Sequence, residues 1–143
     1  MFVTAPKYLN SVLIFILAAC ASAQPVCPVD EIIVKGHMDH PPSNAKVRLQ
    51  LMYAKNMPGE AGDITPESDT FTLPVDFLTQ SRQPIVNGSF GKCGRKPTDV
   101  IVTLLDGKTD REYDRISLNF VKDFKKTDPS TYVKFDVVLK GPQ

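Results

Sequence analysis

His37, Asp39 and His40 are the strongest candidates for metal chemistry in this sequence. Two imidazoles and a carboxylate are ligands that zinc and copper accept in proteins. Histidines three residues apart share a face of a helix, whereas this stretch is predicted to end a strand and runs into Pro41 and Pro42. The chain has no other histidine. We therefore interpret the stretch as a polar turn and predict no metal site.

Acidic pairs that could serve as general acid and base lie in the segment 55–69, which is rich in proline and glycine and is predicted to be a long loop. They are Glu60 with Asp63 and Glu67 with Asp69. A flexible loop would hold these carboxylates poorly for proton transfer. The Gly-Ser-Phe-Gly stretch lacks the pattern of a nucleophile elbow. The sequence therefore predicts a non-enzymatic protein without a cofactor.

The N-terminal segment has the three parts of a secretory signal peptide. Lys7 supplies the positive charge, Leu9–Ala19 is largely apolar, and the small residues of Ala21–Ala23 form a cleavage site before Gln24. The apolar run is about half of the roughly 20 residues that a membrane-spanning helix needs. We therefore expect a signal peptide over 1–23, a secreted, extracellular protein and one domain over 24–143.

Cleavage before Gln24 changes how many cysteines remain. Cys20 leaves with the signal peptide, so the mature chain keeps Cys27 and Cys93. Two cysteines in an oxidising compartment normally pair. We predict a Cys27–Cys93 disulfide that closes a loop of about 66 residues and stabilises the fold by roughly 4 kcal/mol in the chain-entropy model. The alternative is two free thiols.

The charge of the mature chain is balanced. Lys7 is the one basic residue of the signal peptide, so the mature chain carries as many basic as acidic residues. Nucleic acids and anionic membranes call for a basic surplus or stripe. We predict that the mature protein binds neither nucleic acid nor membrane. Two local basic clusters are interpreted as solvated charges: Lys92, Arg95 and Lys96, and Lys122, Lys125 and Lys126.

Apolar residues alternate with polar ones along most of the mature chain, which is typical of strands with one buried face. Pro74 donates no amide hydrogen, which predicts an edge strand or a bend there. The segment 117–126 could form a helix, but its β neighbours favour a strand. The residues predicted to face the core are Val47, Leu49, Leu51, Tyr53, Phe71, Leu73, Val75, Phe77, Ile116, Leu118, Phe120, Val133, Phe135, Val137 and Leu139.

About seven strands in this length predict an all-β sandwich of immunoglobulin-like or transthyretin-like type, with a small closed barrel as the alternative. Two packed sheets allow every alternating strand to bury its apolar side. The segment 100–105 is apolar enough to be buried on both faces, and Gly36 is expected to end the first strand. The predicted strands are 32–34, 46–54, 70–77, 85–90, 100–105, 111–124 and 132–139.

Long loops in compact domains often carry function. Met57 and Ile64 are apolar residues within the predicted loop 55–69. They either fold back onto the sandwich or contact a partner. We predict that these two residues, together with Arg95, Lys96 and Arg111, contact the partner.

Asn87 begins the Asn-Gly-Ser tripeptide, which is the one N-glycosylation sequon of the chain. In a secreted protein it can carry a glycan and make the chain a glycoprotein. The alternative is an unmodified Asn-Gly turn.

Two resemblances bear on fold and role. The order of VKGHMDHPPSNAKVRLQL, DTFTLPVDF and GKCGRKPTDVIV resembles the secreted transthyretin-like proteins of nematodes, although the additional cysteines and the histidine-cysteine segment of that family are missing. This resemblance implies a sandwich that carries a small apolar ligand.

The signal peptide, the one-domain size and the stretches FLTQSRQPIVNGSFGKCGRKP, EYDRISLNF and KDFKKTDPS resemble small secreted proteins of plant-associated fungi, many of them candidate effectors. This resemblance implies a virulence role in the apoplast through an extracellular host protein. We predict that function first and the carrier function as its alternative.

Overall fold

The computed structural model describes residues 29–78, 82–84, 90–92 and 96–143. Some features predicted from the sequence lie outside these ranges and remain predictions. They are the signal peptide, Cys27, Cys93, Asn87, Arg95 and most of the strand over 85–90.

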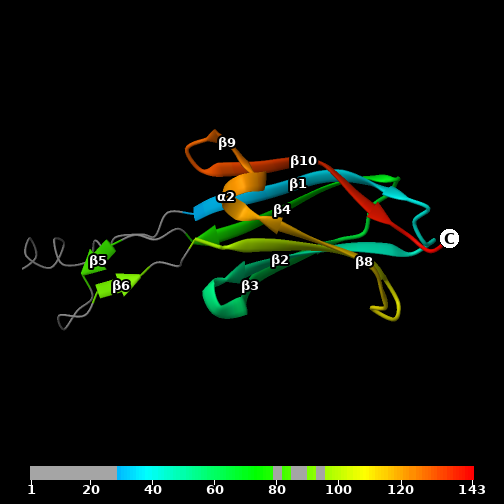
Figure 1. The fold of residues 1–143 in the computed structure, drawn as a ribbon, viewed down its shortest axis with the longest axis horizontal. Coiled ribbons are helices and arrows are strands. Elements are labelled where there is room, and N and C mark those ends of the chain that lie inside the picture. Colours follow the sequence, from blue (N-terminus) through cyan, green and yellow to red (C-terminus); the bar gives the residue numbers. More distant parts are fainter. Residues whose placement is uncertain (1–28, 79–81, 85–89, 93–95) are drawn as a thin grey trace, which may run out of the picture.

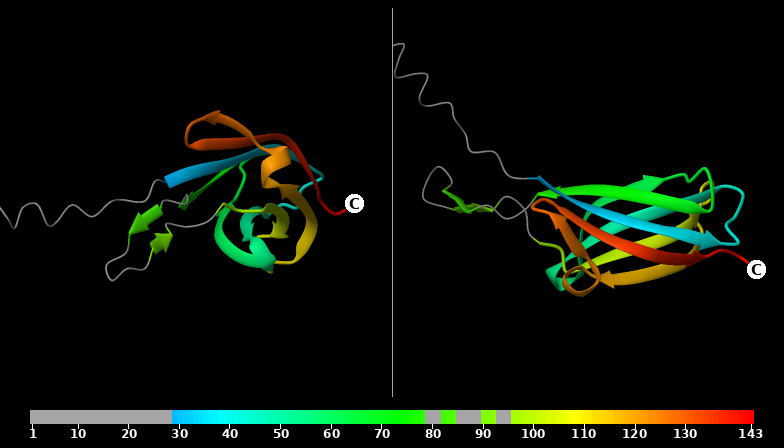
Figure 2. Two further views of the ribbon diagram at one scale, coloured as in Figure 1. Left: turned by 60° about the vertical axis from the view of Figure 1, so that its left-hand side comes forward. Right: turned by 90° about the horizontal axis from the view of Figure 1, so that it is seen from above.

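Two four-stranded sheets pack against each other and form a β-sandwich, which confirms the predicted all-β architecture (Figures 1 and 2). Sheet A has the strand order β4-β1-β10-β9, and sheet B has the order β3-β2-β7-β8. All pairings are antiparallel except that of β1 with β10, which is parallel. Strands β5 and β6 form a short separate ribbon beyond one end of the two layers (Figure 1). The elements are β1 (Val29–Asp39), β2 (Ala45–Tyr53), η1 (Ala54–Asn56), β3 (Met57–Ile64), β4 (Thr70–Leu78), β5 (Arg82–Pro84), β6 (Phe90–Lys92), β7 (Asp99–Asp106), β8 (Glu112–Asn119), α2 (Phe120–Asp123), β9 (Lys125–Asp128) and β10 (Thr131–Lys140).

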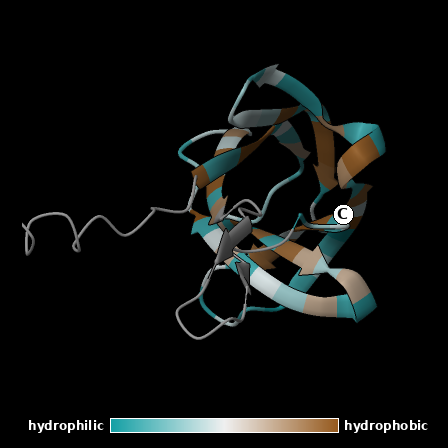
Figure 3. Ribbon diagram, turned by 90° about the vertical axis from the view of Figure 1, so that its left-hand side faces the viewer, coloured by the Kyte–Doolittle hydropathy of each residue, from teal (hydrophilic) through white to brown (hydrophobic). Residues whose placement is uncertain are grey.

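The core lies between the sheets and is built from alternate residues of the long strands (Figure 3). The predicted inward residues of β2 and β4 are all buried, which confirms both strands and their faces. Pro74 lies on β4, which is an edge strand of sheet A as predicted. The ten largest fully buried side chains are Phe77, Ile32, Leu49, Leu51, Leu104, Leu139, Val34, Val47, Val100 and Val102.

Strand β7 is buried on both faces, as its apolar run predicts. Val100, Val102 and Leu104 belong to the core between the sheets. Thr103 and Leu105 are also buried, although they lie outside that core cluster. The outward face of β7 therefore has an apolar component of its own.

The predicted loop over 55–69 is wrong, because most of it is strand β3 on the edge of sheet B. The proline and glycine residues of this segment led to the prediction of a loop, since both are depleted in central strands. An edge strand tolerates Pro58 because only one side of β3 is paired, with β2. Gly62 marks a close approach: a Cβ at this position would lie 2.9 Å from Val75 Cγ2.

The predicted inward position of Phe135 is also wrong. A register shift between Val34 and Gly36 places one extra residue on β10, and Asp136 adopts a positive φ of 58° there. The extra residue reverses the alternation. Val137 therefore faces the core, whereas Phe135 is 47% exposed.

Gly36 does not end the first strand but makes this bulge possible. A Cβ at Gly36 would lie 2.0 Å from the carbonyl oxygen of Val137, so only glycine fits against the bulged segment. Strand β1 accordingly continues to Asp39.

A single helical turn, α2, interrupts the predicted strand 111–124 after Asn119. The Asn119 side chain accepts hydrogen bonds from the amides of Val121 at 3.1 Å and Lys122 at 3.0 Å, which is an N-cap. The turn brings Phe120 into an aromatic cluster at one end of the core. Its ring centroid lies 6.0 Å from that of Phe77 and 4.8 Å from that of Tyr132.

Candidate binding surface

His37 and Asp39 form a local pair on the surface of β1. Nε2 of His37 lies 3.4 Å from Oδ1 of Asp39, and each side chain is 49% exposed. His40 follows the end of the strand with a positive φ of 51°. Within the residues that the structure describes, no group of three or more His, Cys, Asp and Glu side chains could hold a metal ion.

The predicted partner-binding residues that the structure describes are spread over both ends of sheet B. Met57 and Lys96 lie at the end of sheet B where β7 begins, and Arg111 follows the other end of β7. These ends are about 25 Å apart at the usual rise of a strand. Ile64 is partly buried and packs against the core, whereas Met57 is 47% exposed. Arg95 lies outside the described residues.

The outward face of sheet B carries a groove with a volume of about 380 Å³, here called the outer groove. Its floor is the outward side of β7, and its walls come from β2, β8 and the β7–β8 turn. The residues that line it are Arg48, Gln50, Met52, Ile101, Thr103, Leu105, Asp110, Glu112 and Arg115.

The strand register sets the order of these side chains. Thr103 lies between Arg48 on β2 and Arg115 on β8, directly opposite both. Two positions along β7, Ile101 lies opposite Gln50 on β2 and Ser117 on β8. Because alternate residues of a strand share a face, these cross-strand rows all point away from the core.

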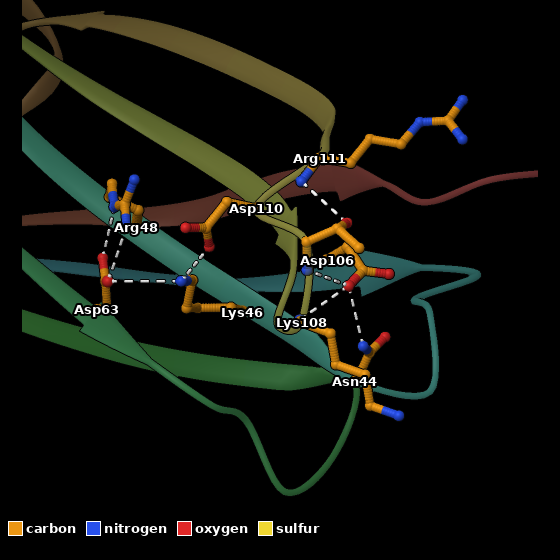
Figure 4. Close-up of polar contacts among 9 residues, drawn as sticks. Asn44, Lys46, Arg48, Asp63, Asp106, Lys108, Asp110 and Arg111 are labelled. Carbon is orange, nitrogen blue, oxygen red and sulfur yellow. Dashed lines mark hydrogen bonds and ion pairs between the residues drawn. The ribbon is translucent and has the colours of Figure 1, made fainter.

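Ion pairs fix the wall of the groove on the β2 side (Figure 4). Arg48 donates from Nε and Nη2 to the two carboxylate oxygens of Asp63, at 2.8 and 3.0 Å. Lys46 donates to Oδ1 of Asp110 in the β7–β8 turn and lies 3.9 Å from Asp63. The hydrogen bond from Arg48 lowers the pKa of Asp63 and raises the pKa of Arg48 itself. These contacts connect β3, β2 and the β7–β8 turn.

A similar pair fixes the opposite wall. Arg115 donates from Nε and Nη2 to Glu112, at 3.0 and 2.9 Å. Each pair is bidentate, which restrains the guanidinium more than a single contact would. Both walls therefore carry charged groups that are paired within the protein.

The β7–β8 turn that closes one end of the groove is organised by Asp106 (Figure 4). Its Oδ1 accepts from the amides of Lys108 at 2.8 Å and Thr109 at 3.0 Å, and from Nδ2 of Asn44 at 3.0 Å. The amide of Lys108 and then that of Thr109 are the main causes that lower the pKa of Asp106. Figure 4 shows the side chain of Arg111 pointing away from these contacts, and its guanidinium lies over the ring of Tyr113.

Sequence reasoning did not identify the outer groove. One signal for it was present, because the segment 100–105 is apolar on both faces while its neighbours in the sheet have polar outward residues. The pairing of β7 with β2 and β8 was needed to bring the charged residues around that floor.

Comparisons with protein-family models, with curated proteins and with solved structures give no match. Among the described residues, no helix has the length and apolar character to cross a membrane.

Proposed function

We propose that this chain is a secreted interaction protein that acts by binding, and that the outer groove of sheet B contacts its partner. The observation that carries the proposal is the groove on the outward face of β7, where Ile101 is partly exposed between walls of ion-paired charged side chains. Protein interfaces combine an apolar centre with a polar rim in this way.

The resemblance to small secreted proteins of plant-associated fungi bears on the kind of partner. It favours an extracellular host protein as the partner and a virulence role in the apoplast. The mature protein would begin at Gln24, carry the Cys27–Cys93 disulfide and present Asn87 for glycosylation. Intact mass spectrometry of the secreted protein, before and after reduction and deglycosylation, measures all three features.

A carrier function with a ligand between the sheets receives less support. The space between the sheets is filled by fully buried side chains, among them Phe77, Ile32 and Leu49. A ligand there would have to displace close-packed residues, at a cost of several kcal/mol for each large side chain moved. A surface groove needs no such rearrangement.

The strand order supports a finer assignment of the sandwich. In the immunoglobulin constant-type order the first two strands are neighbours in one sheet. Here β1 and β2 lie in different sheets. Of the two types predicted, we therefore propose the transthyretin-like type for the fold.

Capture from host extracellular fluid tests the binding function. The tagged, oxidised protein over 24–143 is compared with an Ile101→Lys variant, which places a charge on the groove floor. The matched control is Thr72→Lys on the exposed face of β4 in the other sheet. Circular dichroism and thermal unfolding establish that both variants are folded.

The proposal predicts a host protein that is retained by the unchanged chain and by Thr72→Lys but lost with Ile101→Lys. Equal retention by all three proteins would assign the interaction to another surface. A folded protein that retains no host protein would overturn the binding function.

A further inference from the structure

The charged side chains along the outer groove follow a definite order, which bears on the kind of polypeptide segment that the groove can bind. This inference rests on the proposed function. At the end near the β7–β8 turn, Leu105 is flanked by the carboxylates of Asp110 and Glu112, whose side chains are 59% and 42% exposed. Lys46 pairs with Leu105 from β2, but its side chain is only 18% exposed and its ammonium is bound to Asp110. The first band therefore presents two exposed carboxylates, each in an ion pair: Asp110 with Lys46 and Glu112 with Arg115.

The second band is basic. Arg48 and Arg115 stand on either side of Thr103, and their α-carbons are about 10 Å apart because two strand spacings separate them. Their intramolecular ion pairs use Nε and Nη2 of each guanidinium. Nη1 of each is not used by these pairs and can donate to a further carboxylate. Arginine suits this task because its planar fork offers five donors in fixed directions.

The third band is apolar with polar neighbours. Ile101 lies on the floor between Gln50 and Ser117, and Met52 lines the groove beyond Gln50. Successive bands are two residues apart along β7, which is about 7 Å.

An extended polypeptide repeats its side chains on one face with the same spacing of about 7 Å. We propose that the outer groove binds an extended segment of the partner that presents a basic, an acidic and an apolar side chain at alternate positions, in that order from the β7–β8 turn. The basic residue meets Asp110 and Glu112, the acidic residue meets the two arginines, and the apolar residue covers Ile101. The groove carries both positive and negative side chains, so the net charge of a segment does not decide whether it binds. The order of the charges along the segment decides it.

Synthetic peptides with one composition test the order directly. The matching peptides carry fluorescein on the N-terminus and an amide on the C-terminus, and they are Lys-Thr-Glu-Thr-Leu and its reverse Leu-Thr-Glu-Thr-Lys, so that both chain directions along β7 are covered. The control peptides exchange lysine and glutamate: Glu-Thr-Lys-Thr-Leu and its reverse. Fluorescence anisotropy with the protein over 24–143 gives the affinities, and amide chemical shifts locate the bound peptide.

We expect the better matching peptide to bind at least about fivefold more tightly than either control, since two exposed charge contacts change sign between them. The shifted amides should belong to β2, β7 and β8. Arg115→Glu should abolish the preference, because it reverses one of the two charges of the basic band. Arg111→Glu is the matched control and should keep the preference, since that guanidinium lies over Tyr113 and does not line the groove.

Equal affinities for all four peptides would overturn the charge order, and so would a preference that survives Arg115→Glu. If the host protein is captured through Ile101 while the peptides show no preference, the binding function stands and the charge order alone is wrong. If capture also fails, the binding function itself is wrong.

Discussion

The ring of Tyr53 lies directly over Gly59, so that a Cβ on Gly59 would be 2.0 Å from Cε2 of the tyrosine. The tyrosine is held in place from its far end, where its hydroxyl donates to the carboxylate of Glu60 at 2.7 Å. The contact joins the end of β2 to the edge strand β3, and it explains why β3 has a glycine at this point.

Gly59→Ala should therefore destabilise the protein, although alanine is a conservative change. Displacing the ring should cost about 1–3 kcal/mol, as overpacking of a filled site does. Urea unfolding followed by circular dichroism measures the change. Ala61→Ser, on an exposed position of the same strand, is the control and should stay within about 0.5 kcal/mol. A stable Gly59→Ala protein would mean that Tyr53 moves without cost.

The cap of α2 should contribute measurably to stability. Asn119→Ala removes the acceptor for the amides of Val121 and Lys122 and should cost about 1 kcal/mol. Asn119→Ser keeps a capping oxygen and should recover most of that loss. If both variants unfold at the same urea concentration, the side-chain hydrogen bonds are not what stabilises the turn.

Asp106 should make stability depend on pH. Its pKa is lowered in the folded protein, so the unfolded chain binds more protons between the two pKa values. The stabilisation is therefore complete above the unfolded value of about 3.9 and is lost as the pH falls through the folded value. Thermal unfolding between about pH 2 and pH 6 measures this dependence. As the pH falls, the melting temperature should decrease less for Asp106→Asn than for the unchanged protein. An equal decrease of the melting temperature with pH in both proteins would contradict this role of Asp106. Asp110→Asn, in the same turn but without the amide contacts, is the control.

Phe135 should be far less important for stability than the alternation of β10 suggests. Because the bulge turns it out of the core, Phe135→Thr should cost about 1 kcal/mol or less, mainly through its contact with the Lys35 ammonium, 5.6 Å from the ring centroid. Leu139→Ala, at a fully buried position of the same strand, should cost about 2–5 kcal/mol. Chemical denaturation compares the two. A large loss of unfolding free energy in Phe135→Thr would mean that the Phe135 ring lies in the core and that the bulge is absent.

Strands whose alternation is regular could be predicted from the sequence, with the faces that they bury. Val47, Leu49 and Leu51 are examples, because every second residue is apolar and nothing interrupts the period. Phe135 shows where such reasoning fails. One bulged residue reverses the period, and the cause lies on another strand, where Gly36 allows the close approach.

The candidate site was harder to predict than the fold. Arg48 and Arg115 are 67 positions apart in the chain and meet across Thr103 only through the pairing of three strands. Local sequence cannot supply that register. Local composition placed two of the five predicted partner-binding residues, Met57 and Ile64, in a loop over 55–69, although both belong to an edge strand.

The two neighbouring edge strands β3 and β4 each contain a proline, Pro58 and Pro74. A proline offers no amide hydrogen, so neither edge presents an uninterrupted row of donors to a second molecule. The register shift of β2 between Gln50 and Met52 disrupts the ladder beside β3 further. This side of the sandwich thus resists the edge-to-edge growth that leads from a β-rich protein to fibrils, which favours a dispersed state at high concentration.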